Sequence, residues 1–424
     1  MTDFEQTDYF LDPETTAAPH AYWEFARARC PVWREPHHDV ALVSGYDEAI
    51  AVYHDNATWS ACNAVAGWQF PVPLEGDDVS DLIEQHRDEL VFSEELPAMD
   101  PPKHTAHRGL LLRLITPKRL KENEDFMWRW ADVQLDEILG REGCEFVDEF
   151  ARPFTAVVIA DLLGVPEADR ATFRDEMLGK KQEAYATVGD GVNALVADPF
   201  AFMHDRFTRY VEDRRREPRD DVLTALATAT FPDGTLPEVH EVVVIAANLF
   251  GAGQETTVHL LSASLRWIAE QPEIQQALRE DHRLIPNFIE EVLRYDSPLK
   301  GPFRLSRTPT TVGGVDLPAG TTAMVLIGAA NRDPRQFDSP DEFRPNRPNA
   351  RQHVAFGHGI HSCVGAPLAR AEARIALERL LDRTTDLRIS EAHHGPPGAR
   401  SYEYRPTYMI HGMRRLHLEY TTRS

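Results

Sequence analysis

Cys363 is the residue of this chain with the clearest capacity for chemistry. It lies in a glycine-rich segment, FGHGIHSCVG at residues 356–365, directly before a predicted helix. Glycines permit tight turns and the close approach of a flat ligand. At the start of a helix, unpaired N–H groups and the helix dipole stabilise a thiolate, which is the form of cysteine that binds metals such as iron. His361, two residues earlier, can donate a hydrogen bond to an anionic group lying over this segment.

The other cysteines give no such signal. Cys30, Cys62 and Cys144 are far apart and form no C-x-x-C pair. We therefore expect neither a disulfide framework nor an iron–sulfur site, and we interpret each of the three as a small buried hydrophobic residue.

A carboxylate beside a hydroxyl, Glu255-Thr256, is the second chemical signal. It lies in GAGQETT, residues 251–257, in the middle of a long apolar segment. Each glycine inside a helix costs about 1 kcal/mol relative to alanine, and a threonine that bonds to a carbonyl one turn earlier bends the helix. A weakened helix in a core indicates a groove beside a reactive centre, where the carboxylate and hydroxyl relay protons into a dry site. The alternative is a charged residue and a threonine that merely reach solvent.

Charged residues at other places predict an anion site and an internal anchor. His104 and Arg108 lie one helical turn apart and follow MDPPK, a typical helix start. Taken alone, they also fit a solvated helix face. Glu291 and Arg294 form an E-x-x-R pair, a spacing that is ordinary on helix surfaces, but they lie in an apolar segment 72 residues before Cys363.

Helices must position most of these residues. Residues 237–270 are apolar nearly all round, open on Pro237 and end before Pro272, so we expect a core helix about 50 Å long with Pro237 at its first position. Two more helices are predicted over 273–297, and a strong amphipathic helix follows Cys363. Residues 103–230 are also predicted to be helical, with a mobile connection at 184–199.

The β structure is predicted to be small. We expect a strand followed by a helix over 40–55, short strands and turns over 312–334, and strands over 402–420. Residues 64–98 are predicted to form a long acidic loop, a kind of segment that is usually functional or mobile.

Composition bounds the function. The chain has 424 residues, of which 45 are basic and 68 acidic, and its net charge is -23. This balance argues against nucleic acid or an anionic membrane as the partner of the whole surface, but it leaves room for a local basic patch. No apolar run of membrane-spanning length and no leader segment is present, so we expect a cytoplasmic protein. Without a linker or repeat, we expect one domain over 1–424, large enough to enclose a cofactor.

The cysteine segment resembles the haem-binding loop of the cytochrome P450 family, F-x-x-G-x-H-x-C-x-G, and the resemblance extends over nearly the whole chain. It implies a mainly α fold with a small β portion, in which haem b (iron protoporphyrin IX) lies between the long central helix and the helix after the cysteine loop. It also implies that Cys363 is the axial iron ligand. The implied cofactor-binding residues are His104, Arg108, Ala252, Gly253, Arg304, Phe356, His361, Cys363 and Gly365.

The resemblance further implies an enzyme that inserts oxygen from O2 into a substrate. Thr256 would serve oxygen activation and Glu255 the proton relay, matching the acid–alcohol pair of the family. Glu291, Arg294 and Arg347 would hold the fold behind the haem. The positions that match the family's substrate pocket are mostly apolar, so we expect hydroxylation or epoxidation of a small terpenoid, steroid-like or aromatic compound. These positions are Trp68, Phe70, Asn248, Ala252, Leu299 and Ile410.

Electrons must come from a partner, because no flavin or iron–sulfur segment is fused to the chain. The resemblance implies a ferredoxin and its reductase, and a monomeric enzyme. We expect the ferredoxin to dock over the cysteine loop on a basic patch formed by Arg113, Arg351, His353, His358 and Arg370. Two alternatives remain open at the level of sequence. One is a peroxide-driven peroxygenase, against which the presence of Thr256 argues, and the other is a non-catalytic haem carrier or sensor.

Overall fold

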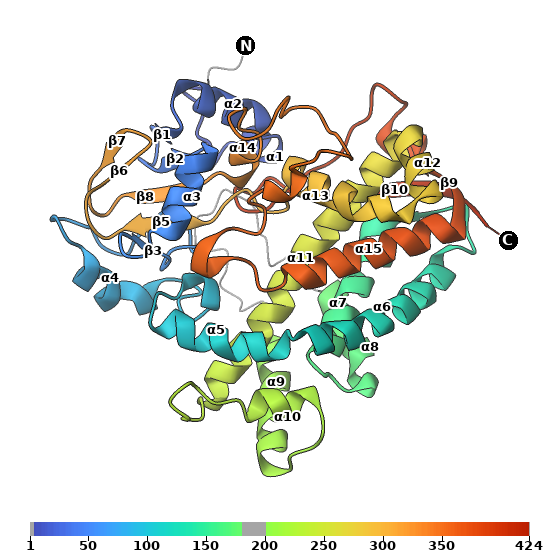
Figure 1. The fold of residues 1–424 in the computed structure, drawn as a ribbon, viewed down its shortest axis with the longest axis horizontal. Helices are drawn as coiled ribbons and strands as arrows, with labels where there is room; N and C mark the ends of the chain where they lie inside the picture. The colour runs from blue at the N-terminus through green and yellow to red at the C-terminus, as the bar shows by residue number, and fades with distance from the viewer. Residues whose placement is uncertain (1–3, 180–200, 424) are drawn as a thin grey trace.

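The longest helix, α11 (Val239–Glu270), crosses the middle of the molecule, and other helices pack along it (Figure 1). The structure is a computed structural model that describes residues 4–179 and 201–423, so the predicted connection at 184–199 lies outside the described residues. At 1.5 Å per residue, the 32 residues of α11 span about 48 Å. The helix begins two residues later than predicted, because Glu238 caps it in a capping box with Glu241 and leaves Pro237 outside.

Helices make up most of the described chain, which confirms the predicted mainly α class. The two helices predicted over 273–297 and the helix predicted after Cys363 are present. In chain order, the helices other than α11 are α1 (Pro13–Ala17), α2 (His20–Arg29), α3 (Tyr46–His54), α4 (Ser80–His86), α5 (Lys103–Leu114), α6 (Pro117–Ile138), α7 (Arg152–Leu162), α8 (Glu167–Gly179), α9 (Ala201–Arg216), α10 (Val222–Ala227), α12 (Pro272–Glu280), α13 (Ile285–Tyr295), α14 (Ile327–Ala330), α15 (Ala366–Arg383) and α16 (Glu391–His394).

The β portion consists of one five-stranded sheet and two smaller sheets. The large sheet has the order β1 (Val32–Arg34), β2 (Ala41–Val43), β8 (Thr322–Val325), β5 (Phe303–Ser306) and β3 (Trp59–Ser60). Strands β2 and β8 are parallel, and the other neighbours are antiparallel. The second sheet has the order β4 (Gly143–Glu145), β10 (His417–Thr422) and β9 (Thr384–Ile389), and β6 (Thr310–Val312) pairs with β7 (Val315–Leu317).

Two predictions of local structure were wrong. Residues 64–98 are not a single loop, since they contain α4 and 3-10 turns at Arg87–Glu89 and Leu96–Ala98. In the segment 402–420, only β10 is a regular strand, and before it the chain makes isolated bridges between Leu299 and Ile410 and between Tyr404 and Met413. Pro406 and Gly412 interrupt the alternating pattern there, and both residue types disfavour strand interiors.

The core forms where α11 contacts α7, α9 and α15, and where α6 contacts α7 and α15. Helix α7 is buried over nearly its whole length, from Arg152 to Leu162. Helix α15 lies beside α6 and α11, so the segment that carries Cys363 enters the molecule next to the long helix (Figure 1). Among the described helices, not one has both the length and the apolar character of a membrane span.

Candidate active site

Two left-handed glycines shape the segment that carries Cys363. Gly357 and Gly359 have φ angles of +66° and +68°, which favour glycine, and a Cβ at Gly359 would overlap the backbone of Tyr53 at the end of α3. The backbone N–H of Cys363 donates to the carbonyl of Phe356 at 2.8 Å and closes the loop. Helix α15 begins at Ala366.

The Cys363 thiol lies on an internal surface. The side chain of Cys363 is accessible, yet desolvation by the surrounding protein raises the pKa of its thiol. Because the thiol is both accessible and surrounded by protein, it faces a hollow inside the molecule. The backbone N–H groups of Gly365 and Ala366 and the charge of Arg108 act in the opposite direction but do not overcome burial. The predicted stabilisation of a thiolate by N–H groups at the helix start is therefore present, and coordination to a metal ion, which displaces the thiol proton, would favour the thiolate further.

Four basic or imidazole groups gather beside this loop. The rings of His104 and His361 are 4.1 Å apart, and Arg108 donates to the carbonyl of Ser362 at 2.6 Å. Arg304 is buried on β5 and donates to the carbonyl of Phe303. Burial, together with neighbouring arginines, lowers the pKa of His104 to about 4 and that of His361 to about 2.

These four groups fit an anionic ligand. Both ring nitrogens of His104 and Nε2 of His361 are buried without a hydrogen-bond partner among the described residues. Within that same part of the chain, neither these histidines nor Arg108 and Arg304 form an ion pair with an acidic side chain. Buried donors and guanidinium groups of this kind require negative partners. The two propionate groups of haem, beside an accessible cysteine, match this donor set.

The middle of α11 has one exposed position. Ala252 is exposed although most of the surrounding helix is buried, and Thr256 donates its hydroxyl proton to the carbonyl of Ala252 at 2.8 Å. The helix continues unbroken through this turn. Packing explains the glycine at position 253, because a Cβ there would lie 2.9 Å from Cδ1 of Ile159 on α7. The structure thus leaves Ala252 accessible beside the Thr256 hydroxyl and packs Gly253 against α7.

Glu255 lies in a cluster of cationic and imidazole side chains. It forms an ion pair with the buried Arg152, which also binds Asp148 at 3.0 Å. Nε2 of His259, one turn further along α11, lies 3.5 Å from Glu255, and Arg405 lies 4.0 Å from it. The side chain of Glu255 is 13 % exposed, so part of it reaches water, but its Oε2 is buried.

The predicted anchor forms a buried three-residue network. Arg294 donates two hydrogen bonds to Glu291, each 2.8 Å long, and Nε of Arg347 lies 3.0 Å and 3.1 Å from the two carboxylate oxygens of Glu291. Both arginines also donate to backbone carbonyls of the segment 331–342. The network fixes α13 to this segment, which leads towards the cysteine loop.

The residues predicted for the substrate pocket do not all lie together in the structure. Trp68 packs on Phe10 with ring centres 4.5 Å apart, and Phe70 packs in a different apolar cluster with Cys62 and Val79. Leu299 and Ile410 are brought together by a β-bridge, and Asn248 and Ala252 lie one turn apart on α11. The structure therefore does not unite Trp68 and Phe70 in one pocket wall, because each fills its own small core.

Asn248 has a role that sequence reasoning missed. Its side-chain amide donates to Glu95, and His240 pairs with Glu94 at 2.7 Å. Both contacts tie the end of segment 64–98 to α11. Sequence reasoning also missed Asp100 of MDPPK, which binds Arg87 at 2.5 Å and Arg307 at 2.7 Å, and the only available signal was its place before a helix start.

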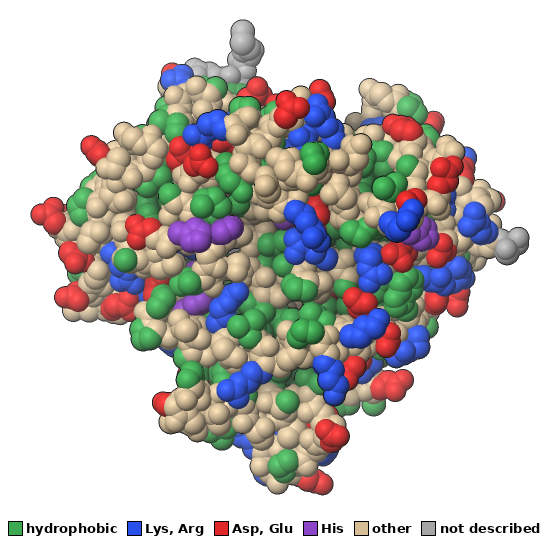
Figure 2. All heavy atoms as spheres, viewed as in Figure 1, with side chains coloured by type: hydrophobic (Ala, Val, Ile, Leu, Met, Phe, Trp, Pro, Cys, Tyr) green, Lys and Arg blue, Asp and Glu red, His purple; other side chains and the backbone are tan. Residues whose placement is uncertain are grey.

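Only some residues of the predicted basic patch lie on the surface. Arg113, Arg351 and His358 are exposed, and His358 lies 2.7 Å from His54. His353 is buried and binds Glu290 at 3.0 Å, so the prediction of His353 as a surface residue was wrong. Arg370 binds both carboxylate oxygens of Glu290. Figure 2 shows that blue Lys and Arg side chains recur across the middle of this face, with red acidic side chains among them.

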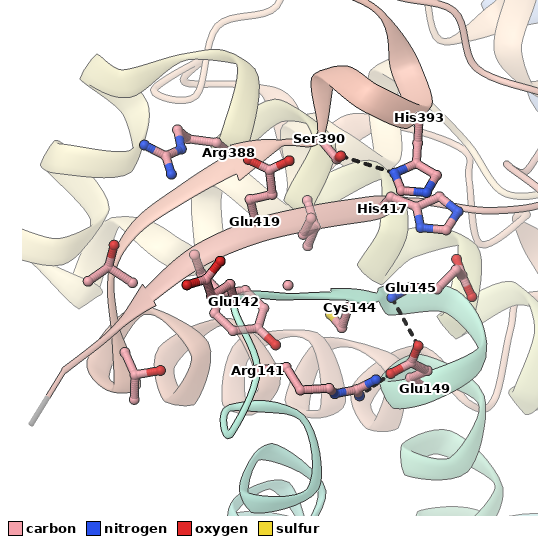
Figure 3. Close-up of a pocket in the computed structure, with 15 residues that line it drawn as sticks. Arg141, Glu142, Cys144, Glu145, Glu149, Arg388, Ser390, His393, His417 and Glu419 are labelled. Carbon is pink, nitrogen blue, oxygen red and sulfur yellow. Dashed lines mark hydrogen bonds and ion pairs between the residues drawn. The ribbon is translucent and has the colours of Figure 1, made fainter.

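A broad groove of about 780 Å³ lies elsewhere, over β4, β9 and β10 (Figure 3). Its lining includes Arg141, Glu149, His393 and His417 but none of the residues predicted for the haem site or the substrate pocket. Cys144 contributes to it and is buried, as is Cys62, and burial raises the pKa of the two thiols to about 12 and about 11. Cys30 is only half-buried, which departs from the prediction.

Comparison with known proteins identifies the family of this chain. The family model described as Cytochrome P450 matches residues 186–385. Cytochrome P450 144 of Mycobacterium tuberculosis is 34 % identical over 403 residues, which cover 92 % of this chain and 88 % of that protein. Cytochrome P450 monooxygenase PikC of Streptomyces venezuelae is 33 % identical over 412 residues, 96 % of this chain and 92 % of the relative.

Solved structures show the same relationship. The substrate-free Mycobacterium marinum cytochrome P450 CYP150A6 superposes with a TM-score of 0.93 at 51 % identity and covers both chains fully. CYP109E1 from Bacillus megaterium, solved in complex with testosterone, has a TM-score of 0.78 at 28 % identity over 95 % of this chain and 99 % of its own. The chain belongs to the cytochrome P450 family. It has the fold of that family, whose members are monooxygenases that bind haem through a cysteine thiolate.

Proposed function

We propose that this protein is a monooxygenase that holds haem through Cys363, takes electrons from a ferredoxin and its reductase, and hydroxylates or epoxidises a small apolar substrate. The observation that carries the proposal is a cluster of four basic or imidazole groups beside an accessible cysteine. His104 and His361 have buried ring nitrogens without a hydrogen-bond partner among the described residues, and Arg108 and Arg304 have no acidic partner there. This cluster supports a dianionic ligand with a metal at its centre, held at its edge by these donors. Thiolate-bound haem iron supplies the binding and reductive cleavage of dioxygen.

The protein residues would perform three tasks around that group. His104, Arg108, Arg304 and His361 would orient the propionates, and Phe356 and Gly365 would shape the cysteine side. Each conversion of RH and O2 into ROH and H2O consumes two electrons and two protons, so protons must reach a site shielded from water. Glu255, at the boundary with solvent, would take up protons, and the hydroxyl of Thr256 would pass them on by rotating away from the Ala252 carbonyl.

The apolar nature of the substrate is supported by the residue types at three of the predicted pocket positions. Ala252 is exposed on α11, and the Leu299–Ile410 bridge brings two aliphatic side chains together. The steroid bound by CYP109E1, testosterone, is a compound of the expected class. We therefore propose a terpenoid, steroid-like or aromatic substrate.

Two experiments test this function. In the first, the holoenzyme is screened by difference spectroscopy against testosterone, limonene and naphthalene, and we expect an apolar binder to shift the Soret band. In the second, Thr256→Ala is compared with Thr256→Ser in turnover driven by NADH, ferredoxin and reductase. The alanine variant should release peroxide instead of oxidised product, whereas serine keeps the hydroxyl and the coupling. Unchanged product yield in Thr256→Ala would contradict the mechanism, and turnover with peroxide but not with ferredoxin would identify a peroxygenase.

A further inference from the structure

Three histidines from distant parts of the chain form a line that ends at Glu255. His259 is the inner member, with Nε2 3.5 Å from Oε2 of Glu255. His411 comes next, because the residue after it, Gly412, lies so close to His259 that a Cβ would overlap the imidazole. His20 at the start of α2 is the outer member, with its ring centre 5.5 Å from that of His411.

Asp296 accompanies the outer half of the line. Single ligand atoms of His20, Asp296 and His411 all lie within 4.8 Å of one another, and Nε2 of His411 is 3.9 Å from Oδ1 of Asp296. The other carboxylate oxygen of Asp296 accepts hydrogen bonds from Arg266 at 2.7 Å and Trp267 at 2.8 Å. One oxygen of Asp296 is thus fixed, while the other faces the imidazoles.

The outer end of the line meets a small cavity. His20 lines a pocket of about 160 Å³ together with Trp23, Arg332 and the exposed side chains of Glu24 and Asp341. The inner end, at Glu255, belongs to the proton relay proposed above. The line therefore connects a place beside the surface of α2 with the acid of the candidate active site.

The nitrogens of the line are poorly satisfied within the protein. Nδ1 of His20, Nδ1 of His411, both nitrogens of His259 and Oε2 of Glu255 are buried without a hydrogen-bond partner among residues 4–179 and 201–423. Leaving a buried polar group without a hydrogen-bond partner is unfavourable. The 3.5 Å between Nε2 of His259 and Oε2 of Glu255 suits a direct contact, whereas the ligand atoms of His20, Asp296 and His411, which lie within 4.8 Å of one another, can share a bridging water. Bound water would also join His411 to His259.

The surrounding charges favour neutral imidazoles over a bound cation. Arg266 binds Asp296, and the ammonium group of the buried Lys300 donates to the carbonyls of Thr16 and Thr407. Arg332 lies at the cavity. Burial and these positive neighbours lower the pKa of His411 to about 3 and hold those of His20 and His259 well below the usual value. A neutral imidazole offers one donor and one acceptor, so it can accept a proton on one nitrogen and release another from the second.

We propose that His20, His411 and His259, joined by bound water, form a proton inlet that reprotonates Glu255 from the cavity beside α2. The inference rests on the proposed monooxygenase function and adds the route by which its protons enter. In each passage one proton enters at His20 and one leaves at Glu255, and each imidazole exchanges one N–H bond for another. Electrons come separately, from the redox partner.

The test removes the inner or middle histidine and compares two reactions of the holoenzyme. His259→Phe and His411→Phe keep a ring of similar size, and the phenyl ring at 411 can still stack on Tyr404. His394→Phe replaces another buried histidine, which lies outside the line and bonds to Ser401 and His417, and serves as the matched control. The first reaction is dioxygen consumption driven by NADH through a ferredoxin and its reductase, in H2O and in D2O. The second is guaiacol oxidation driven by hydrogen peroxide, which needs no external protons for O–O cleavage.

We expect both line variants to consume dioxygen roughly 100-fold more slowly, the lower end of what a proton-transferring group contributes. Their solvent isotope effect should rise, peroxide-driven guaiacol oxidation should stay at the wild-type rate, and His394→Phe should change none of these. Equal losses in both reactions would overturn the proposal, because they would show a structural role. Unchanged dioxygen consumption, or a stoichiometric metal ion that is lost in His20→Phe, would also overturn it. Failure of the underlying function would differ, since the wild-type enzyme would then consume no dioxygen.

Discussion

Arg347 provides a quantitative test of the buried anchor behind the cysteine loop. It is 2 % exposed, binds both oxygens of Glu291, and donates to the carbonyls of Asp338, Ser339 and Glu342. Arg347→Met keeps much of the volume but leaves these acceptors without their donor. Breaking a buried ion pair costs about 3–5 kcal/mol. We expect the lower end, about 3 kcal/mol, because Arg294 still neutralises Glu291.

The chain offers a matched control three residues away. The side chain of Arg344 is 36 % exposed and pairs with the surface carboxylates of Glu342 and Asp338, although its backbone N–H also reaches Glu291. Arg344→Met retains that N–H and should leave stability unchanged.

The expected change in Tm follows from the unfolding entropy, which is about 2.1 cal/mol/K per residue. For 424 residues, a loss of about 3 kcal/mol at Arg347 lowers Tm by roughly 3–4 °C. Calorimetry of both apoproteins measures it, and equal Tm values for the two variants would refute the assigned role of the buried network.

Three further predictions follow from individual contacts. Burial opposes ionisation of Glu290, but its bonds to His353 and Arg370 prevail and lower its pKa from 4.5 to about 2, so its contribution to stability is complete above about pH 4.5 and is lost as the pH falls towards 2. The stability difference between wild type and Glu290→Gln in denaturant titrations should therefore be constant near neutral pH and shrink in acid, and a difference that grows in acid would contradict this. Gly253→Ala gains about 1 kcal/mol of helix propensity, but its Cβ must displace the flexible end of the Ile159 side chain at a cost of about 1–3 kcal/mol, so the net loss of stability should not exceed about 2 kcal/mol. Ile159→Val should cost less in the Gly253→Ala background than alone, and additive losses would exclude the contact. Asn248→Ala removes the hydrogen bond to Glu95 and should speed amide hydrogen exchange in residues 87–99. Unchanged exchange rates in the variant would show that this hydrogen bond does not hold the segment in place.

Strong periodicity made the main helices predictable from the sequence. The continuous apolar surface of residues 239–270 and the amphipathic pattern after Cys363 identified α11 and α15, because such long patterns have few alternative structures. Helix α4 escaped prediction since its seven residues carry too little periodicity within an acidic stretch. Strand β4 is shorter still, with three residues, and pairing with β10 stabilises it.

At the site, the resemblance indicated residue types and places but not their partners. His104, Arg108 and His361 come together as expected, while Trp68 and Phe70 separate because each fits a different aromatic or aliphatic cluster. The surroundings of Glu255 were invisible in the sequence, since Arg152, His259 and Arg405 reach it from three elements. Contacts between residues so distant along the chain depend on the packing of the whole core, which local patterns do not encode.

The state of Cys363 is the central claim, and one spectrum tests it most directly. The reduced holoenzyme is mixed with carbon monoxide, and the wild type is compared with Cys363→Ser and with Cys30→Ser, a half-buried cysteine outside the site. A thiolate ligand predicts the red-shifted Soret band that gives the cytochrome P450 family its name in the wild type and in Cys30→Ser, and its loss in Cys363→Ser. A folded, haem-loaded wild type without that band, or a Cys363→Ser variant that keeps it, would contradict the account.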